Sequence, residues 1–156
     1  DSLLAVASTI DLKMYGTGTL DGNSPRRSIY LTVKRSQMIP FLTMFDVPEA
    51  LQGIGERSVT TVPTQSLAFM NSPLVRGAAQ KLAARVRAKD AAVEPAIEQA
   101  YQIALARVPS QAERDRMRSF IERQAESYGN TPAARDQALT DFCQVLICLN
   151  EFIYVD

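Results

Sequence analysis

The second half of the chain carries a series of helix start and stop signals, and this series limits the fold more than any other feature. Ser72 and Thr131 each stand directly before a proline, as an N-cap stands before the first helical residue. Ser110 has Glu113 three residues later, which is the capping-box pattern. Gly129 follows the next segment as a stop signal. Residues 72–150 are therefore predicted to form four helices joined by short turns.

Apolar residues recur at helical spacing between these signals. The residues predicted to face inward are Leu74, Val75, Ala78, Ala79, Leu82, Val86, Ile97, Ala100, Tyr101, Ala104, Leu105, Ala138, Phe142, Val145 and Leu149. Shorter helical segments are predicted over 1–10, 41–45 and 63–71. The fold class predicted is mainly α, a compact bundle of about five to six helices.

The first third of the chain has a different pattern. Residues 15–26, "YGTGTLDGNSPR", are rich in Gly and polar residues and predict an irregular loop. The following alternation of Ile29, Leu31 and Val33 with polar residues predicts one short strand near 27–35. The C-terminal segment "EFIYVD" also has strand composition and is the candidate partner. Residues 38–63 contain three Pro and two Gly and are expected to form a second irregular region.

Composition argues against several classes of function. The chain has no His and no Trp, which removes the commonest general base and metal ligand and the strongest stacking residue. Lys plus Arg and Asp plus Glu are both 17, so no net field favours nucleic acid. No apolar run reaches the 18 residues that a membrane span needs. We expect no cofactor, no metal site, no nucleic-acid partner and no membrane insertion in this chain.

The two cysteines, Cys143 and Cys148, lie five residues apart on a predicted helix. Five residues correspond to about 7.5 Å of rise, too far for a disulfide within the helix. We interpret both as small buried hydrophobic residues of the core. Pairing with a part of a longer chain stays open.

Four arginines are the candidates for contact with an anion, because facing guanidinium groups bind phosphate, sulfate or carboxylate through paired hydrogen bonds. They are Arg26, Arg27, Arg35 and Arg57. The alternative is that they form salt bridges with Asp46, Glu56 or Glu151. A pair of catalytic acids could be built from Asp46, Glu49, Asp141 or Glu151, but no spacing brings two of them together. We predict no catalytic residue.

Five ordered blocks resemble a known family. They are "RRSIYLTVKRS", "FDVP", "RSVTTVPTQSLAFMNSPLV", "ALARVPSQAE" and "DFCQVLICLNEFIYVD". Together they resemble the planctomycete-specific domain of unknown function 1553. The residues that match its motifs are Arg26, Arg27, Tyr30, Arg35, Phe45, Asp46, Pro48, Arg57, Thr60, Pro63, Gln65, Asn71, Pro73, Cys143, Gln144, Asn150, Glu151, Phe152, Tyr154 and Asp156.

The resemblance implies a context rather than a reaction. Such domains lie at the C-terminal end of large exported proteins, often with a cytochrome-c-like haem module and sometimes with sugar-binding modules upstream. We therefore expect residues 1–156 to be one domain, a C-terminal fragment of a longer extracytoplasmic protein, with the upstream domains as its partners. None of the matching residues has a known catalytic role.

Two functional hypotheses follow. The first is a noncatalytic structural or docking module, in which a buried polar network joins the strand, the loop and the last helix. Its members would be Asp46, Gln65, Asn71, Gln144, Asn150 and Glu151, with Arg27 and Arg57 as cationic partners. The second is a ligand-binding or catalytic domain for an anionic glycan, sulfated or uronic, with the arginines as its anion site.

Overall fold

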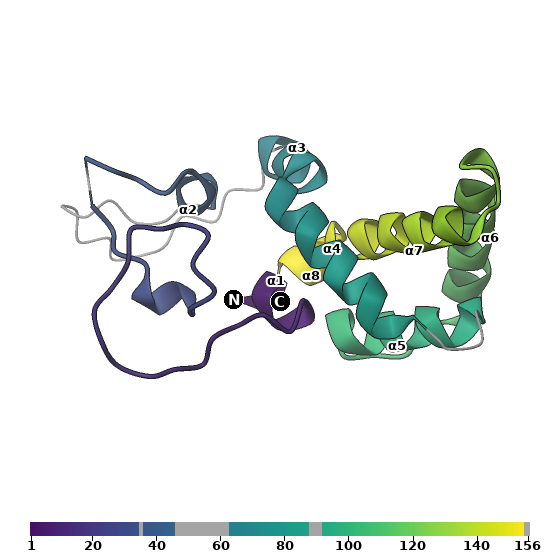
Figure 1. Cartoon of the computed structure of the whole chain (residues 1–156), viewed down its shortest axis with the longest axis horizontal. Helices are drawn as coiled ribbons and strands as arrows, with labels where there is room; N and C mark the ends of the chain where they lie inside the picture. The colour runs from purple at the N-terminus through teal and green to yellow at the C-terminus, as the bar shows by residue number, and fades with distance from the viewer. Residues whose placement is uncertain (35, 46–62, 88–91, 155–156) are drawn as a thin grey trace.

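The computed structural model describes residues 1–34, 36–45, 63–87 and 92–154. Arg35, Asp46 and Arg57 lie outside these residues. The described part forms eight α-helices and one short 3-10 helix, η1 (Figure 1). Their bounds are α1 Ser2–Val6, η1 Ser28–Tyr30, α2 Pro40–Met44, α3 Pro63–Asn71, α4 Pro73–Val86, α5 Val93–Leu105, α6 Gln111–Ser127, α7 Pro132–Ile147 and α8 Asn150–Ile153. The mainly α prediction is confirmed.

Helix α7 is the centre of the helical body. It packs most extensively against α4 and α6, while α5 contacts α4, α6 and α7 at one end (Figure 1). The core lies between these helices and consists of fully buried side chains, the largest being Tyr101, Phe142, Leu82, Ile97, Leu146 and Ile147. This arrangement buries an apolar stripe from each helix, which is what stabilises helices of this length in water.

The predicted caps define the helix ends. In α6 the Ser110 hydroxyl accepts a hydrogen bond from the Glu113 amide at 3.3 Å, and the Glu113 carboxylate accepts one from the Ser110 amide at 2.7 Å. The Thr131 hydroxyl accepts a hydrogen bond from the amide of Ala134 at the start of α7. Gly129 ends the preceding turn with a φ of +91°, a left-handed conformation that favours glycine. Ser72 is the N-cap of α4, as predicted.

The inward face of α7 differs from the prediction at two positions. Val145 is 38% exposed, and Leu149 is the N-cap of α8 rather than a core residue of α7. Cys143, Leu146 and Ile147 fill the core instead. The face is rotated because α7 packs between α4 and α6 and must bury a wider stripe than one row of residues.

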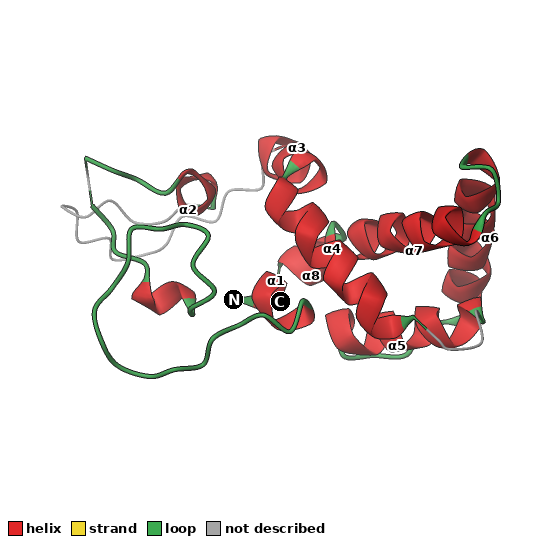
Figure 2. Ribbon diagram, viewed as in Figure 1, coloured by secondary structure: helices red, strands yellow, loops and turns green. Residues whose placement is uncertain are grey.

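The predicted strand at 27–35 was wrong for the residues described. Residues Ser28–Tyr30 form the 3-10 helix η1, drawn in red in Figure 2. Pairing among the described residues nearby is limited to isolated bridges, such as that of Thr19 with Leu31. Ile29 is 80% exposed, so the alternation does not face a core. The cause is a turn at Ser28, whose amide donates to the Asp1 carboxylate at 2.6 Å. In the proposed partner segment, the described residues 151–153 belong to helix α8, and Tyr154 follows it in an extended conformation.

Residues 8–34 and α2 lie beside the helical body as a loop region (Figure 1). Residues 8–34 are held by hydrogen bonds, whereas α2 packs Phe41 and Phe45 against Phe69 of α3 at the edge of the core. None of the described side chains between Ser8 and Phe45 is buried. Within the described ranges, no helix is long and apolar enough to cross a membrane.

Candidate functional site

Arg26 is the centre of the loop region. Its guanidinium group donates to the carbonyl oxygens of Thr17 at 2.9 Å, Tyr15 at 2.7 Å and Lys13 at 3.3 Å. It also stacks 3.6 Å from the centre of the Tyr30 ring, and the Tyr30 hydroxyl accepts a hydrogen bond from the Tyr15 amide. The loop 13–17 therefore encloses this cation, and both terminal nitrogens are engaged by main-chain oxygens.

Arg27 points to a different partner. Its Nε donates to the Asp1 carboxylate at 3.1 Å, and the other oxygen of Asp1 accepts from the amide and hydroxyl of Ser28. The two adjacent arginines thus diverge, Arg26 toward the 13–17 loop and Arg27 toward the start of α1. They do not form a pair of facing guanidinium groups. Arg35 and Arg57, the other two anion candidates, lie outside the described residues.

The residues predicted for the polar network occupy separate places. Gln65, 2% exposed, accepts a hydrogen bond from the Tyr154 hydroxyl at 2.8 Å and so joins α3 to the residue after α8. Asn71 donates within its own helix to the Leu67 carbonyl. Asn150 is exposed and begins α8, where its carbonyl accepts from the Tyr154 amide. Asp46 lies outside the described residues.

Gln144 belongs to a group that we call the Arg76 cluster: Arg76 on α4, Asp141 and Gln144 on α7, and Tyr128, the residue that follows α6. Arg76 donates from Nη1 to the Asp141 carboxylate at 2.6 Å and to the Gln144 side-chain oxygen at 2.8 Å. The Tyr128 hydroxyl donates to the second oxygen of Asp141 at 2.8 Å. This bond to a carboxylate, more than any other factor, raises the pKa of Tyr128. The amide of Gln144 reaches the Met70 carbonyl at the end of α3, so the cluster joins three helices.

Glu151 belongs to a second cluster, the Arg107 cluster, with Tyr101, Arg107 and Glu113. Arg107 binds Glu151 through Nε at 2.6 Å and Nη2 at 2.8 Å. The other edge of the same guanidinium group binds Glu113 through Nη1 at 3.0 Å and Nη2 at 2.7 Å. The guanidinium carbon lies 5.3 Å from the centre of the Tyr101 ring. One cation therefore links the α5–α6 connection to α8.

Arg107 stabilises the ionised form of both carboxylates, those of Glu113 and Glu151. The hydrogen bonds from Arg107, followed by those from Ser110, lower the pKa of Glu113 to about 2. The hydrogen bonds from Arg107 also lower the pKa of Glu151. Burial raises the pKa of Tyr101, and the Glu113 charge adds to that effect. A carboxylic acid with so low a pKa is a poor proton donor near neutral pH, so the geometry supports a structural tie rather than acid catalysis.

The cysteines lie where small hydrophobic residues would lie. Cys143 is fully buried in the core and burial raises its pKa to about 12, while Cys148 is half-buried and its pKa is raised by burial as well. Both are free thiols. Among the described residues, no three His, Cys, Asp or Glu side chains are grouped as metal ligands.

Sequence reasoning did not single out Arg76, Arg107 or Tyr128. Arg107 lies in the block "ALARVPSQAE", six residues before the capping residue Glu113, and this proximity was the one local signal for it. Arg76 meets Asp141 across 65 residues of sequence, which no spacing pattern reveals.

Comparison with known families gives one match. The family described as "Protein of unknown function (DUF1553)", PSD1, matches residues 1–121. The chain belongs to this family. No curated protein and no solved structure matches the chain significantly.

Proposed function

We propose that this chain is a noncatalytic structural or docking module of a larger exported protein, joined in its parent to upstream domains that include a haem-bearing module. The planctomycete setting, the extracytoplasmic location and the haem-bearing neighbour rest on the family resemblance. The observation that carries the noncatalytic part is the engagement of the arginines. Arg26 donates hydrogen bonds to three carbonyl oxygens, Arg76 donates to two side chains of α7, and Arg107 donates to two carboxylates.

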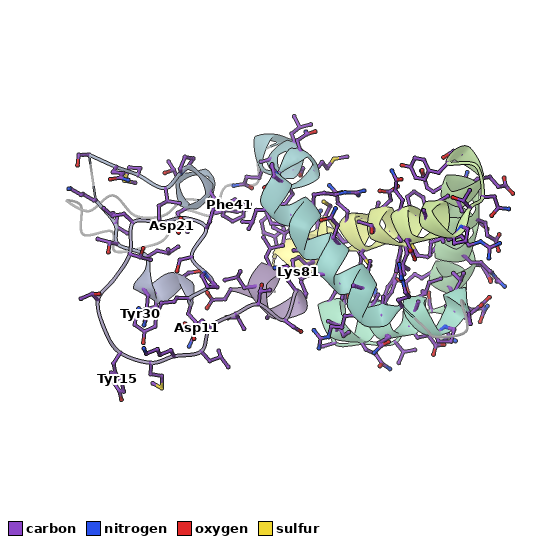
Figure 3. The ribbon with its side chains drawn as sticks, in the orientation of Figure 1. Asp11, Tyr15, Asp21, Tyr30, Phe41 and Lys81 are labelled. Atoms are coloured by element: carbon purple, nitrogen blue, oxygen red, sulfur yellow. The ribbon has the colours of Figure 1, made fainter. Side chains whose placement is uncertain are left out.

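Exposed apolar side chains support the docking part. Leu12, Met14, Tyr15 and Ile29 are 67–80% exposed, and all four belong to the loop region that has no buried side chain of its own. Figure 3 shows Tyr15 projecting from the outer edge of this region, away from the helices. We call these four residues the docking surface. Large apolar side chains that are exposed on an ordered loop can serve as contacts for another domain.

Hydrogen exchange tests the docking role. Amide exchange over residues 12–17 and 28–33 should be measured in the 156-residue chain and again in the longer parent protein. We expect exchange in both segments to slow at least tenfold in the parent, because a covered surface restricts local opening. Equal exchange in the two proteins would contradict docking to an upstream domain.

A thermal-shift titration tests the alternative, a site for an anionic glycan. Sulfated and uronic polysaccharides should be compared with sulfate and phosphate at matched ionic strength. We expect no saturable rise in Tm, because Arg26 and Arg27 are bound to internal acceptors. A saturable rise with one glycan class that is lost in Arg27→Gln would favour the glycan site over the structural module.

A further inference from the structure

A hollow of about 640 Å³ opens between α5, α6 and the N-terminal half of α7. Its floor is apolar and consists of Val93, Ala96, Ile121, Ala125 and Leu139. Three floor residues, Ala96, Ile121 and Ala125, are at most 5% exposed. The short alanine side chains leave room between the helices, and a hollow of this volume is large enough for a small organic molecule.

Charged residues line the rim of this hollow. Arg87 and Asp136 form a salt bridge with one another, so their charges cancel. Arg135 contacts the side-chain oxygen of Asn130 at 3.4 Å. Glu122 and Glu126 lie on α6, and within the described part of the chain no cation pairs with either of them. Apart from the Arg87–Asp136 pair, the described residues of the rim include two acids, Glu122 and Glu126, and one base, Arg135.

The two free carboxylates lie on one face of α6. A separation of four residues places them one helical turn apart, about 6 Å along the axis. Both are exposed at the edge of the hollow, above Ile121 and Ala125 on the same helix. An ammonium group between them could donate to both, since it has three N–H donors, while its carbon chain enters the apolar floor.

We infer that the hollow between α5, α6 and α7 binds an amphipathic amine, a molecule with an apolar body and one ammonium group held by Glu122 and Glu126. Charge complementarity selects this class, because the unpaired rim charge is negative and the floor offers no polar partner to a buried charge. The hollow is lined by residues of α5, α6 and α7, and these helices lie on the opposite side of the molecule from the loop region (Figure 1), so the two proposals do not depend on one another.

Three matched probes test the inference on the full 156-residue chain: 4-phenylbutylammonium, 4-phenylbutanol and 4-phenylbutyrate. They share one apolar body and differ in the head group. Methyl NMR shifts of Ala96, Ile121 and Ala125 report the site, and a titration gives the Kd. For the ammonium probe we expect a Kd at or below about 1 mM, the range of a ligand of this size, with weaker binding of the alcohol and the carboxylate.

Variants separate the head-group contact from the floor. Glu122→Gln with Glu126→Gln should weaken the ammonium probe about fivefold or more and leave the alcohol unchanged. The control removes two charges away from the hollow, Glu98→Gln with Asp115→Asn, and should leave all three affinities unchanged. Ala125→Leu should narrow the floor of the hollow and weaken binding of every probe, the alcohol included, because its added carbon atoms occupy part of the space.

The remaining outcomes overturn the inference. If the carboxylate probe binds more strongly than the ammonium probe, the hollow prefers anionic ligands and the inference is wrong. If the ammonium probe binds equally to the wild type and to the double glutamine variant, the two carboxylates do not contribute to binding. An absence of methyl shifts with all three probes would show that the hollow binds no ligand of this class.

Discussion

Arg107 offers the sharpest test of the structural interpretation. Replacing it by Met keeps an unbranched apolar stem over the Tyr101 ring but removes both bidentate ion pairs, to Glu113 and to Glu151. The side chains of Arg107, Glu113 and Glu151 are 37%, 28% and 46% exposed, so each pair is partly solvated. Each should therefore contribute about 1 kcal/mol, the upper end of the range for exposed pairs.

The two pairs together predict a loss of about 2 kcal/mol of folding free energy in Arg107→Met. For a chain of this length, that corresponds to a fall in Tm of about 4–8 °C at pH 7. Thermal unfolding followed by circular dichroism measures it. Arg123→Met is the matched control, because Arg123 donates only to the Ser119 carbonyl of its own helix, and its Tm should change by about 1 °C or less.

The pH dependence gives an independent check. The pKa of Glu113 falls from 4.5 to about 2 on folding, so its stabilising effect is present above pH 4.5 and is lost as the pH falls through 2. Arg107→Met lacks most of that effect. The Tm difference between the wild type and the variant should therefore be constant from pH 7 to 5 and shrink between pH 5 and 2.

Two results would refute the reasoning about Arg107. The first is a Tm of Arg107→Met within about 1 °C of the wild type at pH 7, which would mean that the ion pairs add no net stability. The second is a Tm difference that is unchanged at pH 2, which would assign the loss to packing on Tyr101 rather than to the carboxylates.

Three further predictions concern the other ties and the core. Arg26→Lys should speed amide exchange in residues 13–17 about tenfold and leave the Tm of the helical body unchanged, because Lys cannot serve three carbonyl oxygens with a planar fork; equal exchange would contradict this. Asp141→Asn should lower Tm by about 2–4 °C through loss of its charge pair with α4, and an unchanged Tm would remove that pair from the stability of the body. Cys143 should react with iodoacetamide at least about tenfold more slowly than Cys148 by mass spectrometry, because it is fully buried and its thiol has a pKa of about 12; similar rates would show that the core opens readily.

Local signals in the sequence were sufficient to predict α1 to α7 but not α8, whose residues have strand composition. The cap at Ser110 involves Glu113 only three residues away, and the stop at Gly129 depends on one residue's freedom to adopt a positive φ. The orientation of α7 was less accessible, because whether Val145 or Ile147 is buried depends on which helices lie on either side. The short strand failed for a similar reason. Its alternation was real, but the contact between Asp1 and Ser28, 27 residues apart, turns the chain there.

The two clusters were beyond sequence reasoning for a more general reason. Arg76 meets Asp141 across 65 residues, and Arg107 meets Glu151 across 44, so each pairing exists only once the helices have packed. Glu151 and Gln144 were selected from a motif, but their partners were not. A motif can point to a residue, but the group that this residue contacts is known only from the fold.

Arginine use connects the fold to the proposed function. Arg26, Arg76 and Arg107 each bind groups from another segment of the chain, and in this way they hold loops and helix ends together. Cations used in this way are not free to bind an outside anion. Charges that lack an internal partner are therefore the better guide to ligands, and at the hollow between α5, α6 and α7 two such charges on the described rim are carboxylates, Glu122 and Glu126, against one base, Arg135. On this argument an anionic glycan is the less suitable ligand and an amphipathic cation the more suitable one.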